Sequence, residues 1–193
     1  MPHDLDRHRP SRLPIVPLFR ERWSARALSG EAIGRDEVLT LLEAARWAPA
    51  DRGEPPWRIV FALRDAESWP VLLDQVPETE RPWARHAGAL LALLIPDTAP
   101  QGTLPPLFAA GAAWQNLALQ ATDMGLVTHA LAPSAGAPPL PGVPPAYRPV
   151  AITVVGRPGR PQDLPEPWRE REVPSGRARL ERYVGEGRFP TPD

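Results

Sequence analysis

Apolar residues recur at helical spacing in two stretches of the chain. Over 36–47 they fall at i, i+3, i+4 and i+7, at Val38, Leu41, Leu42 and Ala45, which is the period of an amphipathic helix. Over 107–124 the inner surface is built mostly from alanines, and Gly125 follows as the expected residue after the helix end. We therefore predict two long helices, and the alanine-rich one should pack centrally.

The pattern between and around these helices predicts strands and two short helices. Segments 57–63, 126–131 and 147–155 are rich in β-branched or apolar residues, which favours strands. Segment 87–95 is apolar without interruption, which is typical of a strand buried on both faces. Short helices are expected over 17–22 and 66–75, the second only if Pro70 lies in its first turn.

The length of 193 residues suits one domain with a proper core. We expect a flexible arm over 1–16, a folded domain over 17–160 and an extended, proline-punctuated tail over 161–193.

Charge and cysteine content restrict the function. The net charge is −1, so no overall field favours nucleic acid or an anionic membrane. The chain has no Cys and no His/Asp/Glu cluster at metal spacing, hence no thiolate nucleophile or obvious metal site. The longest apolar run is too short for a bilayer span, and no signal-peptide core is seen. We expect a soluble cytoplasmic protein with no nucleic-acid or membrane partner.

The segment Arg22-Trp23-Ser24-Ala25-Arg26 is the main candidate for binding chemistry. Two guanidinium groups and a hydroxyl within five residues can hold a phosphate monoester. The alternative is a solvated arginine-rich turn. Arginine is less informative here than usual, because all 22 basic residues are Arg.

Several blocks in order resemble the FMN-dependent nitroreductase family. They are Arg22 to Arg26, Ala44 to Pro49, Pro56-Trp57-Arg58, Gly111 to Leu119 with Met124-Gly125-Leu126, Tyr147 to Ala151 and Val155 to Pro158. The resemblance implies an α+β, three-layer fold with a mostly antiparallel central sheet wrapped by helices. It also implies an intertwined homodimer with FMN at two interface sites, NAD(P)H as co-substrate and a small organic acceptor.

The resemblance also assigns site residues by position. Arg22, Trp23, Ser24 and Arg26 would contact FMN, with Arg169 and Arg171 of the tail reaching its phosphate. Trp47 and Asp51 would approach the flavin from the partner subunit, and the strand-end residues His129, Ala130 and Leu131 would line the ring. The segment 50–55 lacks the amides of the family pattern, and Pro133 has no N–H to donate to the ring. The ring site is therefore altered relative to the family pattern.

Three functions stay open from the sequence. The first is an FMN-dependent oxidoreductase passing hydride from NAD(P)H through flavin N5, with no catalytic side chain. The second is a relative that has lost flavin and acts as a binding or scaffold protein. The third is a specialised flavin enzyme acting on a biosynthetic intermediate. His129 could donate a proton to a reduced acceptor, but a packed strand histidine is the favoured interpretation. Gln115 and Asn116 are interpreted as satisfied polar groups of the core.

Overall fold

A four-stranded sheet with the strand order β1-β2-β4-β3 forms the middle of the computed structural model, which describes residues 5–99 and 102–190. Every neighbouring pair of strands is antiparallel. The elements in chain order are α1 (Leu5–His8), α2 (Leu18–Glu21), α3 (Arg35–Arg46), η1 (Asp51–Gly53), β1 (Arg58–Leu63), α4 (Trp69–Leu73), α5 (Arg81–Ala84), β2 (Ala89–Pro96), α6 (Pro106–Asp123), β3 (Val127–Leu131), β4 (Tyr147–Gly156), η2 (Pro161–Asp163), η3 (Arg169–Arg171) and η4 (Leu180–Arg182).

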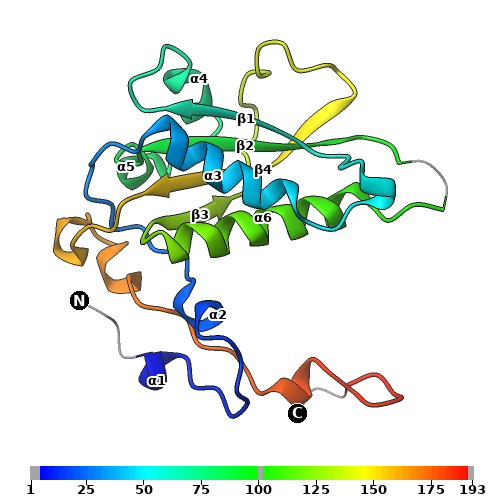
Figure 1. Cartoon of the computed structure of the whole chain (residues 1–193). Coiled ribbons are helices and arrows are strands. Elements are labelled where there is room, and N and C mark those ends of the chain that lie inside the picture. Colours follow the sequence, from blue (N-terminus) through cyan, green and yellow to red (C-terminus); the bar gives the residue numbers. More distant parts are fainter. Residues whose placement is uncertain (1–4, 100–101, 191–193) are drawn as a thin grey trace.

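Helices cover both faces of this sheet (Figure 1). Because strand side chains alternate between faces, β2 contributes to two cores. Its residues Ala89, Leu91, Leu93 and Ile95 pack with α3 and α6. Leu90, Ala92 and Leu94 pack on the other side with residues of α4 and α5. The expected strand buried on both faces is confirmed, as is the α+β three-layer architecture.

The two long helices begin and end as the sequence indicates. At the start of α3 the Glu37 carboxylate accepts a hydrogen bond from the Gly34 N–H at 2.9 Å, and Val38, Leu41 and Ala45 are buried. After α6, Gly125 has φ 71°, a conformation that favours glycine. The next residue, Leu126, donates its N–H to the Ala121 carbonyl at 2.8 Å, which closes the helix end.

The differences from the predicted elements are small. The helix expected over 66–75 is shorter and begins at Trp69, so Pro70 does fall in the first turn. The single-turn helix α5 escaped prediction because it contains a proline and is too short to show a period. The arm contains one helical turn, α1, where no regular element was expected.

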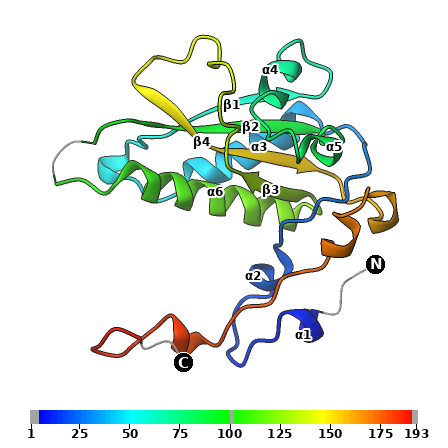
Figure 2. The same ribbon diagram turned by 180° about the vertical axis from the view of Figure 1, so that it is seen from behind.

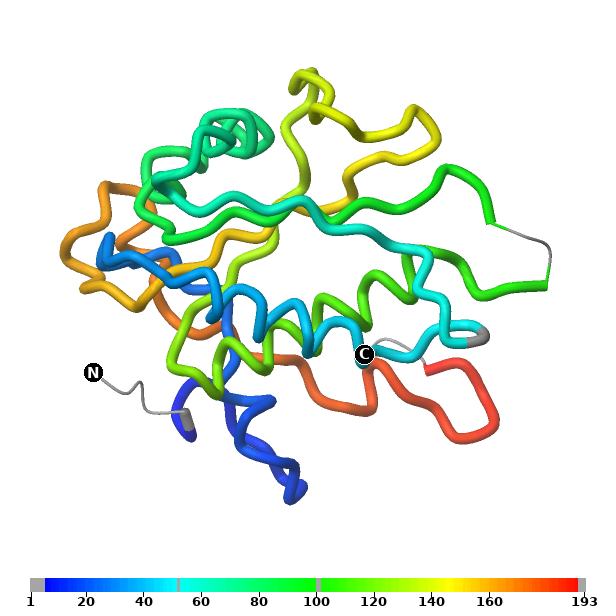
Figure 3. The backbone as a smooth tube through the Cα atoms, turned by 45° about the horizontal axis from the view of Figure 1, so that its top comes forward, coloured from blue at the N-terminus to red at the C-terminus, as the bar shows by residue number. Residues whose placement is uncertain are grey.

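The N-terminal arm, α2 and the last part of the C-terminal tail lie outside the sheet layers, on the side covered by α6 (Figures 1 and 2), whereas Leu164 at the start of the tail is buried in the core. In the tilted view of Figure 3 the blue arm extends below the body, and the orange-to-red tail runs along its lower edge. The segment between α2 and α3 enters the body from this region. Its residue Leu28 forms an isolated antiparallel bridge with Pro158.

Candidate functional site

Arg22 lies at the point where α2 ends and the chain turns toward the body. Its backbone is extended, with φ −66° and ψ 115°, so the chain leaves the helix there. The half-buried guanidinium lies over the Trp114 ring of α6, 5.6 Å from its centroid, at a distance typical of a cation–π contact. Nη1 of Arg22 also lies 3.5 Å from the Ser24 hydroxyl. The two predicted phosphate ligands are thus neighbours on one loop.

The residues that follow are held from two sides. The buried Glu172 carboxylate accepts the backbone N–H of Arg26 at 2.8 Å and that of Ala27 at 2.7 Å. On the other side, Gly159 donates its N–H to the Ala27 carbonyl at 2.8 Å. A Cβ on Gly159 would lie 2.5 Å from the Leu28 carbonyl carbon, so this close approach needs glycine. These contacts fix the end of the loop that contains Arg22 and Ser24.

Two arginines that the sequence did not single out adjoin Arg22. Arg9 of the arm is 8% exposed, and its Nη1 donates to the carbonyls of Arg20 and Arg22 at 2.6 and 2.5 Å. Burial lowers the pKa of Arg22, and the positive charges of Arg9 and Arg177 lower it further. The site is therefore a concentration of positive charge. No motif could have identified Arg9, since it lies in a polar, proline-containing stretch without periodicity.

Arg26 belongs to a second, more buried cluster with His129, Trp83 and Glu80. The Arg26 guanidinium lies 6.0 Å from the Trp83 ring centroid, and its Nε lies 3.8 Å from Glu80 Oε2. That Nε is buried and has no hydrogen-bond partner among the described residues. Glu80 instead accepts the Trp83 indole N–H at 2.6 Å.

His129 of β3 is buried, and its ring lies 5.0 Å from that of Trp83. Its Nδ1 lies 3.3 Å from the Ala25 carbonyl oxygen, which places the proton of the neutral ring on Nδ1. Burial, and then the positive charge of Arg26, lower the pKa of His129 to about 4. The ring is neutral at pH 7, so this geometry favours the packed histidine over the proton donor.

The His129 pKa predicts a loss of stability in acid. Between the unperturbed pKa of 6.5 and the folded value of about 4, the unfolded chain binds more protons than the folded chain. The contribution of the neutral His129 to stability is therefore fully present above this pH window. As the pH decreases through the window, the free energy of unfolding should fall by about 1.4 kcal/mol per pH unit. His129→Asn keeps a donor toward Ala25 but cannot titrate. Urea unfolding between pH 7 and 4 should show a shallower pH slope for the variant. Equal slopes would contradict the assignment.

The other predicted site residues lie in four places. Ala130 and Leu131 follow His129 on β3, half-buried and paired with Thr153 and Ile152. Trp47 and Asp51 lie beyond the C-terminal end of α3, away from α2 (Figures 1 and 2). Within one chain they do not join the Arg22 loop, and their role at a shared site stays a prediction.

Trp23 is half-buried beside Arg22, and the two tail arginines are exposed in η3. The Arg169 guanidinium donates to the Leu164 carbonyl at 3.0 Å and lies 3.3 Å from Glu166 Oε1. It is thus held by its own segment, and the phosphate role of Arg169 and Arg171 stays a prediction. In the core, Asn116 donates to the Ala44 carbonyl at 3.2 Å, as expected of a satisfied polar group.

The model of the nitroreductase family matches residues 19–157, which include the Arg22 loop, all four strands and both long helices. The chain belongs to the nitroreductase family. No curated protein matches it.

Two solved structures illustrate the relationship. A protein described as an oxidoreductase containing FMN is 34% identical, with a TM-score of 0.85, and the match covers 96% of this chain and 97% of the other. A putative nitroreductase in complex with FMN from Desulfovibrio desulfuricans is 23% identical, with a TM-score of 0.70, covering 93% of this chain and 100% of the other. The second match bears on the fold alone.

Within residues 5–99 and 102–190, no helix is long and apolar enough to cross a bilayer. No group of three or more His, Cys, Asp or Glu side chains in the same ranges is placed to hold a metal ion.

Proposed function

We propose that this nitroreductase-family chain is an FMN-dependent oxidoreductase that passes hydride from NAD(P)H to a small organic acceptor. The observation that supports it is the Arg22 loop, where a half-buried guanidinium and a hydroxyl meet in a strongly positive setting. A flavin mononucleotide ends in a phosphate dianion, which is the group that such donors bind best. The relative that contains FMN, at 34% identity over nearly the full chain, gives the same indication.

The donors of the site fit this cofactor. Arg22 and Ser24 would hold the phosphate, and Trp114 and Glu172 keep the loop in place. Arg26 has a buried Nε that makes no hydrogen bond among the described residues and lies 3.8 Å from Glu80 Oε2, so its guanidinium is the further donor that could turn to a polar flavin atom. FMN, when bound, supplies the hydride chemistry itself. At pH 7 the neutral His129 ring donates its Nδ1–H to the Ala25 carbonyl. We therefore expect His129 to orient the strand end and not to donate a proton to the acceptor.

The purified protein tests this proposal directly. It should be yellow, and heat should release FMN rather than FAD, because the chain lacks the glycine fingerprint of dinucleotide sites. Anaerobic addition of NADH or NADPH should bleach the flavin, and the preferred nucleotide would be the one that does so faster. A colourless protein that takes up no FMN on titration would instead support the scaffold alternative, which the altered 50–55 loop favours.

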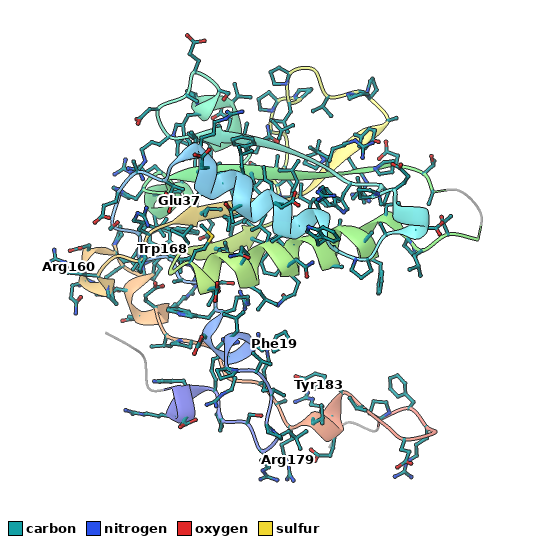
Figure 4. All side chains as sticks on the ribbon, in the orientation of Figure 1. Phe19, Glu37, Arg160, Trp168, Arg179 and Tyr183 are labelled. Atoms are coloured by element: carbon teal, nitrogen blue, oxygen red, sulfur yellow. The ribbon has the colours of Figure 1, made fainter. Side chains whose placement is uncertain are left out.

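We also infer that two chains assemble into the working protein. Large apolar side chains are exposed on α2, α3, α6 and the tail, including Phe19, Trp47, Phe108, Tyr183 and Phe189. Figure 4 shows Phe19 and Tyr183 outside the sheet layers. Apolar exposure of this kind indicates an interface between proteins. A second chain would also explain how Trp47 and Asp51 could reach a site built around Arg22.

Light scattering checks this assembly. The mass in solution should be twice the 21.2 kDa of one chain, because an intertwined interface should bury more than roughly 2,000 Å² and stay closed at micromolar concentration. A mass equal to one chain under these conditions would reject the dimer.

A further inference from the structure

The arm and the tail meet beneath α2, next to Arg22. Arg9 and Arg20 exchange hydrogen bonds, since the Arg20 Nε also donates to the Arg9 carbonyl at 2.7 Å. The tail packs directly on the arm, because a Cβ on Gly176 would lie only 3.3 Å from the His8 carbonyl oxygen. The residue after Gly176 is Arg177. Two segments from opposite ends of the chain therefore meet beneath α2 (Figures 1 and 2), and each carries an arginine next to the point of contact.

These arginines are poorly neutralised by the protein. The Arg9 guanidinium bonds to carbonyl groups, and that of Arg177 to the Ser175 hydroxyl and the Gly176 carbonyl of its own segment, at 3.0 and 2.9 Å. The pKa of Arg9 is lowered by burial and then by the charges of Arg177 and Arg20. Among the carboxylates of this region, Asp6 pairs with Arg20, and Glu172 accepts backbone N–H groups. Like charges held together in this way repel one another unless an anion joins them.

We propose that Arg9 and Arg177 complete the phosphate site of Arg22, so that one bound phosphate dianion holds both the arm and the tail against the body. Within one chain, apolar packing contributes little to holding them, because Leu13, Val16, Leu180 and Val184 are all exposed. Neutralising three guanidinium groups at once would therefore decide whether these segments stay docked. The proposed function identifies the phosphate as that of FMN, and inorganic phosphate offers the same chemistry from another source.

Limited proteolysis of the full-length wild-type protein tests the docking. Trypsin cleaves after arginine, and Arg7, Arg12, Arg179 and Arg182 provide sites in the two segments. FMN should slow cleavage at these sites severalfold, whereas riboflavin, which has the same ring and no phosphate, should not. Inorganic phosphate at high concentration should give part of the FMN effect. Equal protection by riboflavin and FMN would overturn the proposal.

A pair of tail variants tests the arginine itself. Arg177→Ala should weaken FMN about three- to tenfold and leave riboflavin binding unchanged. The matched control is Arg179→Ala, an exposed arginine two residues away that lies 3.7 Å from Glu181. It should leave both affinities within about twofold, since its charge is exposed, pairs with Glu181 and is screened by salt. Arg177 is the better target, because Arg9 also bonds to the α2 carbonyls and its loss would disturb the loop itself.

The outcomes separate this proposal from the proposed function. We call the holding of arm and tail by one phosphate, through Arg9 and Arg177, the clamp. If wild-type protein binds FMN while Arg177→Ala and Arg179→Ala behave alike, only the clamp is wrong. If FMN does not bind but inorganic phosphate protects the arm and tail, the clamp stands and the flavin function fails. If neither ligand protects these segments, the clamp is overturned.

Discussion

Arg22→Ala is expected to weaken FMN binding roughly ten- to a hundredfold. A hydrogen bond from a guanidinium to a phosphate dianion contributes about 1.5–3 kcal/mol, and 1.4 kcal/mol is about a factor of ten in affinity. The fold should survive, because Arg22 is a half-buried residue at a turn whose main side-chain packing is on the Trp114 ring. Flavin fluorescence titration measures the affinity, and circular dichroism checks the fold.

Arg160→Ala is the matched control for this experiment. Arg160 is exposed and bonded to Asp163 at 2.9 Å, and it lies at the edge of the body in Figure 4, well away from α2. Its loss should change FMN affinity by no more than about twofold, since a distant surface charge is screened at physiological salt. Equal affinities for the two variants would return Arg22 to the status of a solvated surface charge.

Local patterns were enough to predict most of the fold. The uninterrupted apolar run over 87–95 became the central strand β2, because an apolar side chain on both faces demands helices on both sides. Gly125 marked the end of α6 because only a residue tolerant of positive φ closes a helix in that way. The arginine loop was predicted because its donors are adjacent in sequence, and the structure brings Arg22 and Ser24 together.

The rest of the candidate site depends on contacts between distant residues. The charges of Arg9 and Arg177 act on Arg22 from opposite ends of the chain, and neither residue lies in a periodic segment. The importance of Glu172 was equally hidden, because its partners are backbone N–H groups 145 and 146 positions away. Arg169 drew attention by its charge, yet its guanidinium bonds within its own turn. Composition indicates which charges exist, and only the folded chain determines what each one faces.

Glu172 should therefore prove the most sensitive residue of the tail. The residue is 4% exposed, and its Oε1 accepts from both the Arg26 and Ala27 N–H groups, at 2.8 and 2.7 Å. Glu172→Ala leaves these two buried donors without their acceptor. Each unsatisfied group costs about 1–3 kcal/mol, so the free energy of unfolding should fall by about 2–6 kcal/mol. Binding of FMN should weaken as well, because the same bonds fix the loop that contains Arg22 and Ser24.

Two further variants decide whether the cause is the carboxylate contact. Glu172→Gln can keep a carbonyl oxygen in the place of Oε1 and so preserve both bonds, but its amide group would face the Arg26 N–H at the Oε2 position, 3.1 Å away. It should fall between the wild type and Glu172→Ala in both stability and FMN affinity. Glu170→Ala removes an exposed carboxylate two residues earlier and should change the free energy of unfolding by less than about 0.5 kcal/mol. Urea unfolding measures all three variants. If Glu172→Ala is no less stable than Glu170→Ala, the tail does not hold the loop, and the position of Arg22 must depend on α2 and Trp114 instead.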